Sequence, residues 1–138
     1  MTVMAAKILC IEDEALIRQL VVEELNDEGY ETIEAANGYE GLKAILQQDP
    51  DLVLCDVSMP GMDGFEMLEM LRTHHPDRDG LPVIFMTGLV DGASKSEGRR
   101  LGVDSYLAKP IDYDVLHAAL ARLLGCDEDP EQIDEGED

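Results

Sequence analysis

Short runs rich in apolar residues alternate along this chain with stretches in which apolar residues recur every three or four positions. The runs cover residues 7–11, 51–56 and 82–86, and each is followed by polar or turn-forming residues. Such runs are typical of strands that are buried on both faces of a parallel sheet. Residues 103–107 predict a further strand, and the alternating pattern of residues 30–35 predicts a strand at the edge of the sheet.

The stretches between the runs predict helices. The first begins after Asp13, the expected N-cap, and ends before Gly29; the second covers residues 37–47; the third runs from Phe65 to near Pro76; and the last covers residues 112–124. The side chains expected to face the core are Leu16, Ile17, Leu20, Val21 and Leu25, then Leu42, Ile45 and Leu46, then Phe65, Leu68 and Leu71, and finally Val115, Leu116, Ala119, Leu120 and Leu123.

The segment from residue 88 to residue 102 differs from the others. It contains glycines at positions 88, 92, 98 and 102 and few apolar side chains. Each interior glycine costs a helix about 1 kcal/mol relative to alanine. We therefore expect a helix of low stability here, and switching elements are drawn from the least stable parts of a fold.

Five strands that alternate with five helices predict a doubly wound, three-layer α/β sandwich, because right-handed connections place helices on both faces of a parallel sheet. The order of the strands does not follow from the periodicity. No glycine-rich phosphate-binding motif follows the first strand, which argues against a nucleotide-binding Rossmann domain.

Length and charge restrict the class of protein. The 138 residues suit one domain, which is expected over residues 7–125. The sequence contains no run of 18 apolar residues, so no membrane-spanning helix is predicted. The net charge of −21 disfavours binding to nucleic acid or to an anionic membrane. Residues 126–138 hold eight acidic and no basic residues, which predicts an acidic disordered tail or the start of a linker.

The three cysteines are widely spaced, and Cys10 and Cys55 lie within predicted strands. Buried, reduced thiols are expected, and with them a cytoplasmic location.

Polar groups follow the ends of the predicted strands, and in a parallel sheet these ends share the edge at which open α/β sheets bind ligands. The groups are Glu12, Asp13, Asp56, Thr87 and Lys109. A cap of the next helix is the alternative role for Asp56, but a long loop with Pro60 and Gly61 separates it from that helix.

Three clustered carboxylates repel one another, and without a counter-charge one of them would take up a proton. A hard dication such as Mg²⁺ or Mn²⁺ relieves this repulsion and suits carboxylates, waters and a phosphate. Lys109 and Thr87 would contact phosphate oxygens, and Asp56 would be the nucleophile of a phosphoryl transfer that forms an aspartyl phosphate.

The motifs at these positions resemble a known family. Glu12-Asp13, the stretch Leu-Cys-Asp-Val-Ser-Met-Pro-Gly-Met-Asp-Gly over residues 54–64, Met86-Thr87-Gly88 and the stretch Tyr-Leu-Ala-Lys-Pro over residues 106–110 are similar to the receiver domain of two-component response regulators. The resemblance covers residues 7–125 and implies a flavodoxin-like fold with strand order 2-1-3-4-5.

The resemblance assigns expected roles to individual residues. Asp56 matches the phosphoacceptor. Asp13, Asp56 and the backbone carbonyl of Ser58 match the metal ligands, with Glu12 nearby, where aspartate is commoner. Thr87 and Lys109 match the switch hydroxyl and the phosphate-binding lysine.

Other positions of the family pattern concern the switch and the lifetime of the phosphoryl group. The Lys109–Pro110 bond is usually cis in the family, and Ser58 and Leu89 match variable positions that tune dephosphorylation. Tyr106 matches a rotating aromatic residue, although an ordinary half-buried strand tyrosine remains an alternative. The expected output face is helix four, strand five and helix five.

The expected donor is a phosphohistidine on a sensor histidine kinase or a histidine phosphotransferase. Only thirteen residues follow Gly125, so we expect output through an unknown downstream protein, onward phosphotransfer or a phosphorylation-dependent homodimer. A stand-alone receiver and the N-terminal piece of a longer regulator both remain open.

Two alternatives differ in class. A phosphohydrolase of the haloacid-dehalogenase type would need a second aspartate as its general acid at position 58, which is serine. An unphosphorylated scaffold with the receiver fold would not need the full set of chemical groups.

Overall fold

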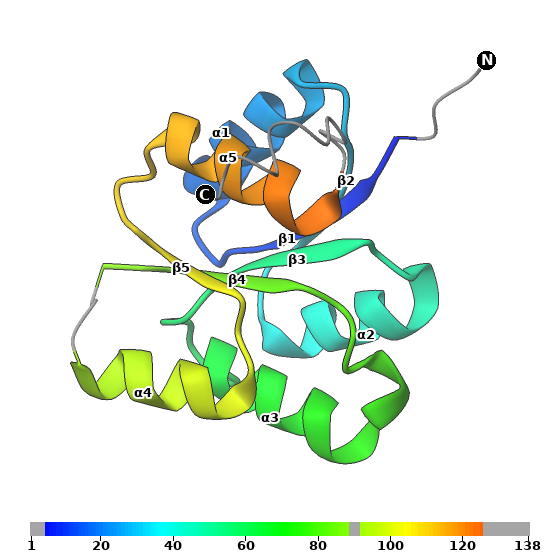
Figure 1. Cartoon of the computed structure of the whole chain (residues 1–138), viewed down its shortest axis with the longest axis vertical. Helices are drawn as coiled ribbons and strands as arrows, with labels where there is room; N and C mark the ends of the chain where they lie inside the picture. The colour runs from blue at the N-terminus through cyan, green and yellow to red at the C-terminus, as the bar shows by residue number, and fades with distance from the viewer. Residues whose placement is uncertain (1–4, 89–91, 126–138) are drawn as a thin grey trace, which may run out of the picture.

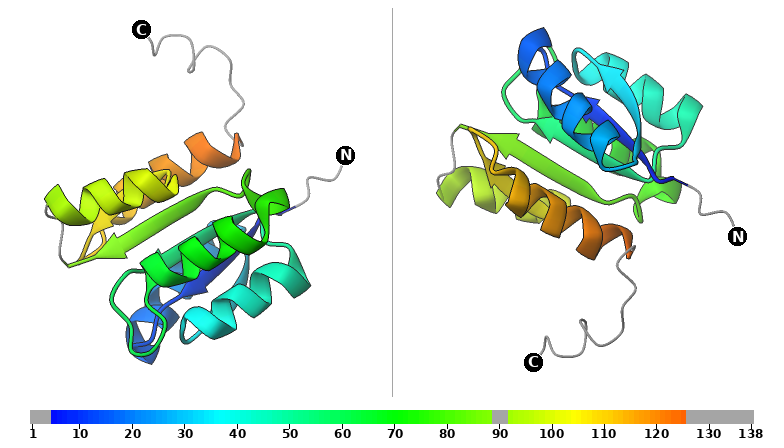
Figure 2. Two further views of the ribbon diagram at one scale, coloured as in Figure 1. Left: turned by 90° about the horizontal axis from the view of Figure 1, so that it is seen from below. Right: turned by 90° about the horizontal axis from the view of Figure 1, so that it is seen from above.

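A computed structural model of the chain describes residues 5–88 and 92–125. Its centre is a five-stranded parallel sheet in the order β2-β1-β3-β4-β5, which confirms the predicted fold. Helices α1 and α5 cover one face, and α2, α3 and α4 cover the other (Figure 1). The two views of Figure 2 show these helical layers in front of the sheet from opposite sides.

The elements alternate along the chain as the pattern predicts. The strands are β1 (Lys7–Ile11), β2 (Glu31–Ala35), β3 (Leu52–Asp56), β4 (Val83–Thr87) and β5 (Ser105–Ala108). The helices are α1 (Ala15–Asp27), α2 (Gly38–Gln48), α3 (Gly64–His74), α4 (Gly92–Leu101) and α5 (Tyr113–Leu124), with a short 3₁₀ turn, η1 (Pro76–Arg78). None of the helices in the described ranges is long and apolar enough to cross a membrane.

Each face of the sheet supports its own core, because successive strand residues point to opposite sides. On the α2/α3/α4 side the core includes Leu9, Val53 and Phe85. On the α1/α5 side it includes Cys10 and Ile84. All five residues of β3 and of β4 are buried, which explains their nearly continuous apolar sequence.

The cysteines Cys10 and Cys55 are free and buried. Burial raises the pKa of Cys10 to about 12 and raises that of Cys55 well above its ordinary value. Both thiols therefore stay protonated at neutral pH and act as small apolar core residues.

The prediction of which side chains of α1 face the core is partly wrong. Leu16 and Leu20 are 69% and 50% exposed, whereas Val21, Val22 and Leu25 are buried. At 3.6 residues per turn, Leu16 lies about 180° and Leu20 about 140° around the helix from Leu25, so both lie on the side opposite the buried stripe. Only a narrow stripe of a helix that lies on a sheet is covered, and a pattern of apolar spacing does not locate its centre.

Two other predicted core side chains are also exposed for the same reason: Leu46 on α2 is 37% exposed and Val115 on α5 is 50% exposed.

The caps differ from the prediction at α1. Its N-cap is Glu14, whose side chain accepts no capping hydrogen bond, so Asp13 is not the cap. Asn37 lies before α2 rather than within it, and its side chain accepts a hydrogen bond from the backbone N–H of Glu40. Asp112 caps α5 as predicted.

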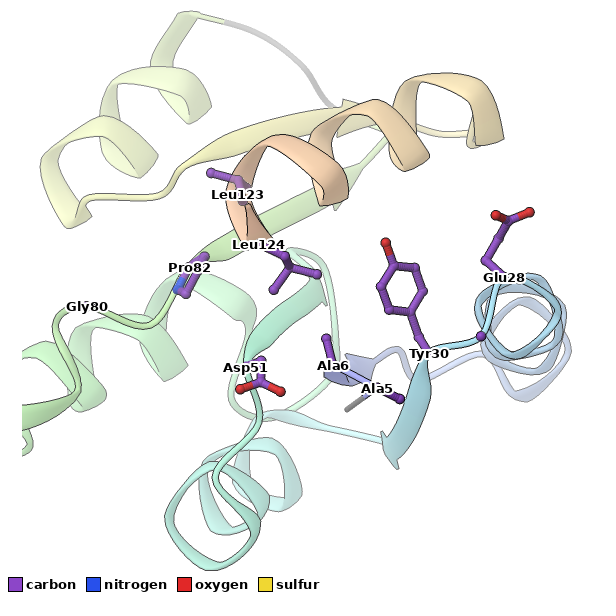
Figure 3. Close-up of a pocket in the computed structure, with 10 residues that line it drawn as sticks. Ala5, Ala6, Glu28, Tyr30, Asp51, Gly80, Pro82, Leu123 and Leu124 are labelled. Atoms are coloured by element: carbon purple, nitrogen blue, oxygen red, sulfur yellow. The ribbon is translucent and has the colours of Figure 1, made fainter. Parts of the chain in front are cut away.

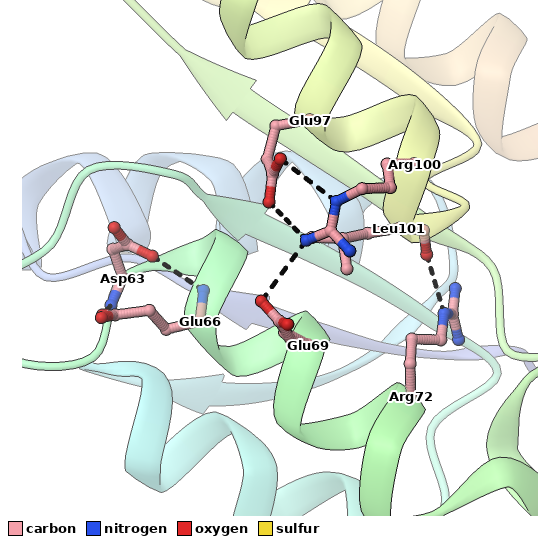
Figure 4. Close-up of polar contacts among 7 residues, drawn as sticks. All are labelled: Asp63, Glu66, Glu69, Arg72, Glu97, Arg100 and Leu101. Atoms are coloured by element: carbon pink, nitrogen blue, oxygen red, sulfur yellow. Dashed lines mark hydrogen bonds and ion pairs between the residues drawn. The ribbon is translucent and has the colours of Figure 1, made fainter.

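Helix α3 begins with a capping box, in which Asp63 and Glu66 each accept a hydrogen bond from the other's backbone N–H (Figure 4). This fixes the point at which the loop after β3 ends.

The glycine-rich segment does form a helix, α4, and polar contacts join its C-terminal end to α3 (Figure 4). Nε of Arg72 donates to the carbonyl oxygen of Leu101 at 2.9 Å. Nη2 of Arg100 lies 2.6 Å from Glu97 and 3.4 Å from Glu69. These contacts partly offset the poor helix propensity of the segment.

Strand β5 begins two residues later than predicted. Oδ2 of Asp104 accepts a hydrogen bond from the backbone N–H of Val83 at 2.8 Å. The backbone N–H of Asp104 in turn donates to the carbonyl of Val83 at 2.8 Å, and the strand ladder starts one residue later, at Ser105.

Candidate functional site

The polar groups predicted from the strand ends lie at one edge of the sheet. Glu12 and Asp13 follow β1, Asp56 is the last residue of β3, Thr87 is the last residue of β4, and Lys109 follows β5. Carboxylate oxygens of Glu12, Asp13 and Asp56 all lie within 4.8 Å of one another. The parallel topology thus brings together residues from distant parts of the sequence.

Lys109 joins two of the three carboxylates. Its Nζ lies 2.8 Å from Oε1 of Glu12 and 3.2 Å from Oδ2 of Asp56. The backbone N–H of Lys109 donates to the carbonyl of Thr87 at 3.0 Å, which places the start of this side chain at the end of β4. The Lys109–Pro110 peptide bond is cis.

Glu12 is more deeply enclosed than the sequence indicates, with no exposed side-chain surface. Its Oε2 accepts a hydrogen bond from the backbone N–H of Glu14 at 3.1 Å. Its own carbonyl accepts one from Nη1 of Arg18 at 2.7 Å. Glu12 therefore holds Lys109 from a fixed position, whereas the sequence showed it only as a neighbour of Asp13.

Asp56 is 4% exposed, and its Oδ1 accepts a hydrogen bond from the backbone N–H of Ser58 at 3.3 Å. Burial, followed by the charge of Glu12, raises the pKa of Asp56 from 3.8 to about 6, although Lys109 opposes the shift. Burial lowers the pKa of Lys109, but its hydrogen bond to Glu12 and the charge of Asp56 raise it further, so the net shift is upward. At neutral pH the site thus holds an ionised Asp56 beside a charged ammonium.

The donor set fits a hard dication. Three carboxylates, whose oxygens lie within 4.8 Å of one another, and one ammonium give the cluster a formal net charge of −2. After burial, the charge of Glu12 is the second cause of the raised pKa of Asp56. Oxygen ligands of this kind suit Mg²⁺ or Mn²⁺.

The loop after β3 returns to the end of that strand, which the sequence did not reveal. The backbone N–H of Gly64 donates to the carbonyl of Val57 at 2.9 Å. A Cβ at Gly64 would lie 2.8 Å from the backbone oxygen of Asp56. Gly64 is thus a site of close backbone contact behind Asp56.

The remaining predicted residues occupy different surroundings. Thr87 is 2% exposed, whereas Ser58 is exposed at the surface. Tyr106 is half-buried against Phe85, with ring centroids 5.7 Å apart. A Cβ at Gly98 of α4 would overlap the ring of Tyr106. Leu89 lies outside the described residues.

A comparison with protein families identifies the chain. The family model described as "Response regulator receiver domain" matches residues 8–121. The chain belongs to this family. It is therefore a receiver domain of two-component signal transduction. Receiver domains are signalling phosphoacceptors rather than conventional enzymes, which argues against the phosphohydrolase alternative.

Relatives of the receiver domain differ in length. Sporulation initiation phosphotransferase F of Bacillus subtilis is 38% identical over 121 residues, which cover 88% of this chain and 95% of the relative. Transcriptional regulatory protein AfsQ1 of Streptomyces coelicolor is 37% identical over 117 residues, which cover 85% of this chain and 50% of the relative. The chain thus spans nearly the whole of one relative and half of another.

Solved structures agree with the family. The chemotaxis protein CheY4 of Vibrio cholerae superimposes with a TM-score of 0.82 at 34% identity, covering 88% of this chain and 100% of that chain. A receiver domain of a Francisella response regulator gives a TM-score of 0.79 at 31% identity, covering 87% of this chain and 97% of that chain.

Proposed function

We propose that Asp56 accepts a phosphoryl group from a phosphohistidine on a sensor histidine kinase or a histidine phosphotransferase, and that residues 7–125 form the working domain. The proposal rests on one observation: within a cluster of three carboxylates, Nζ of Lys109 lies 2.8 Å from Glu12 and 3.2 Å from Asp56. The sporulation phosphotransferase among the relatives adds support for such a donor.

The chemistry assigns a task to each side chain. An oxygen of the Asp56 carboxylate attacks phosphorus, the bond between phosphorus and the histidine nitrogen breaks, and its electron pair returns to the imidazole. Lys109 exchanges its contact with Asp56 for a phosphoryl oxygen while Glu12 keeps hold of its ammonium. Asp56 is the stronger nucleophile above its pKa of about 6, where it is ionised.

Asp13, Asp56 and the backbone carbonyl of Ser58 would hold Mg²⁺ or Mn²⁺, with Glu12 beside them. A bound dication would neutralise charge on the phosphoryl oxygens in the transition state.

The donor is proposed to dock beside this edge on α1. Leu16 and Leu20 are exposed there, and a groove of about 200 Å³ is lined by Ile17, Leu20, Pro110 and Ile111 and reaches Lys109. Exposed apolar side chains next to a polar site suit a partner helix that brings its phosphohistidine to Asp56.

Phosphorylation is proposed to change the face formed by α4, β5 and α5. A phosphoryl group adds roughly −1.5 to −2 charges and new hydrogen-bond acceptors. Movement of Thr87 toward these acceptors would free space for Tyr106, which lies over Gly98 of α4. The changed face would bind a downstream protein or a second copy of the chain.

Intact mass spectrometry tests the phosphoacceptor. Incubation with acetyl phosphate and Mg²⁺ should add one phosphoryl group to the wild type and to the control Asp27→Ala, which changes an exposed aspartate on α1. The addition should be absent in Asp56→Ala and in EDTA. Retention of the addition in Asp56→Ala would contradict the proposal, as would a wild type that neither acetyl phosphate nor a phosphohistidine protein can phosphorylate.

Kinetics test the docking surface. Leu16→Glu and Leu20→Glu should slow transfer from a phosphohistidine protein by at least about tenfold, because they place charge in an apolar contact. Phosphorylation by acetyl phosphate should stay unchanged. Leu46→Glu on α2 is the matched exposed control. Equal slowing by all three variants would remove α1 from the proposal.

Partner binding tests the switch. Tyr106→Ala should reduce the difference in partner affinity between the phosphorylated and unphosphorylated forms, while phosphorylation of Asp56 itself remains normal. An undiminished difference would exclude Tyr106 from the switch.

A further inference from the structure

A second group of metal-binding side chains lies between α1 and α5, away from the acidic edge. It consists of Glu24, Glu28 and His117. One potential ligand atom of each residue lies within 4.8 Å of those of the other two. The proposed phosphoryl transfer makes no use of these residues.

Two helices bring the group together. Glu24 lies on α1 and Glu28 is its C-cap residue, so the two are four positions apart and share one side of the helix. His117 comes from α5, 93 positions from Glu24 in the sequence, and its Nε2 lies 2.7 Å from Oε2 of Glu24. Glu24 and His117 are 31% and 25% exposed, which is enough enclosure to orient them.

Among the described residues, His117 is the only basic side chain that pairs with the carboxylates of this group. Within the described residues, no lysine or arginine forms an ion pair with Glu24 or Glu28. The last turn of α1 contains no basic residue either, although the negative end of a helix dipole favours a cation. The pKa of Tyr113, one turn before His117, is raised by burial and also by the charge of Glu24.

The site is open to solvent on one side. Glu28 is exposed and lies at the margin of a cavity of about 740 Å³ that is also lined by Tyr30 and Leu124 (Figure 3). Most residues of this cavity precede strands, and the others end α5, so the cavity opens at the opposite edge of the sheet from Asp56. A hydrated ion can therefore reach the group without passing through the core.

We propose that Glu24, Glu28 and His117 bind a divalent transition-metal ion of the Zn²⁺ type, which joins the end of α1 to α5. An imidazole nitrogen with two carboxylates is a donor set that favours Zn²⁺ over Mg²⁺ or Ca²⁺. Ligand atoms about 2 Å from a tetrahedral ion lie roughly 3.4 Å apart, so small rotations of the side chains suffice. Water fills the fourth position on the open side.

Isothermal titration with ZnCl₂ tests the site. The full chain should carry Asp56→Asn, which removes one carboxylate from the acidic edge and so limits binding there. In this background His117→Ala and Glu28→Gln should each weaken Zn²⁺ binding by more than about tenfold, since each removes one of three protein ligands. His74→Ala, which removes an exposed histidine elsewhere, should leave the affinity unchanged.

A second measurement separates binding from folding. Glu28 forms no side-chain ion pair within the described residues, so Glu28→Gln should keep the circular dichroism of the metal-free protein while it loses the Zn²⁺-dependent rise in melting temperature. The ring nitrogens of His117 should shift on addition of Zn²⁺ in a nitrogen-15 spectrum. Zn²⁺ affinity within twofold of the parent in either His117→Ala or Glu28→Gln would overturn the three-ligand site, and so would an unshifted His117 ring at saturating Zn²⁺.

Discussion

Nζ of Lys109 lies 2.8 Å from Oε1 of Glu12, a carboxylate with no exposed side-chain surface and 97 positions away in the sequence. The contact joins the residue that follows β1 to the residue that follows β5, across the carboxyl ends of β3 and β4. Among the residues that the structure describes, Lys109 supplies the one ammonium that offsets the buried negative charge of Glu12 and Asp56.

Removal of Lys109 should destabilise the fold. Lys109→Ala leaves Glu12 buried without its partner, and breaking a buried pair from one side costs about 3–5 kcal/mol of unfolding free energy. Urea denaturation at pH 7 measures the loss, with Lys43→Ala, an exposed lysine on α2, as control. The double variant with Glu12→Gln should recover part of the stability. A Lys109→Ala protein as stable as the control would contradict the role of the contact.

The raised pKa of Asp56 makes stability depend on pH. Because this pKa is about 6 in the folded protein against 3.8 ordinarily, the folded state binds the proton more tightly than the unfolded state. The group's favourable contribution is complete below pH 3.8 and is lost as pH rises through 6, a change of about 3 kcal/mol.

Asp56→Asn should therefore be more stable than the wild type by up to about 3 kcal/mol at pH 8, and the gap should close toward pH 4. Urea titrations in EDTA across this range provide the measurement. A difference in stability between the two proteins that does not change with pH would show that folding does not raise the pKa of Asp56.

Mg²⁺ should raise the melting temperature of the wild type, because a ligand that binds only the folded state stabilises it. At a hundredfold excess over its Kd the rise should be about 10 °C. Asp13→Asn removes a proposed ligand and should abolish most of the rise, whereas Asp27→Asn should not. Circular dichroism is the suitable probe, since the chain contains no tryptophan.

Gly64→Ala should disturb the loop behind Asp56. The added Cβ would lie 2.8 Å from the backbone oxygen of Asp56 and 3.0 Å from Cα of Val57, and such crowding costs about 1–3 kcal/mol. Phosphorylation by acetyl phosphate should slow as the carboxylate moves. Gly80→Ala, where a Cβ meets nothing within 4 Å, should change stability by less than about 0.5 kcal/mol. Equal losses of stability in the two variants would show that crowding at Gly64 is not the cause.

Much of the fold could be predicted because the apolar runs of β1, β3 and β4 are buried on both faces and so show little ambiguity. The exposed Leu16 and Leu20 could not be distinguished from core residues. Apolar residues lie on more than one side of α1, and only the packing of the helix on the sheet decides which side is covered.

The candidate site, like the fold, could be predicted from the sequence only in part. Clustering of Asp13, Asp56 and Glu12 follows from the rule that parallel strands end at one edge. The buried anchor role of Glu12 and the close contact at Gly64 depend on side-chain packing and loop path, which spacing does not encode. His117 and Glu24 are joined only because α5 packs beside α1, so no local pattern marks the pair.

The acidic edge has a consequence for chain integrity. Its groups come from the ends of β1, β3, β4 and β5, and the lysine is the last to be synthesised. A chain truncated before residue 109 would retain Asp56 but lack the ammonium that holds the edge together. The proposed phosphoacceptor site is therefore complete only after the last strand of the sheet and Lys109 have been synthesised.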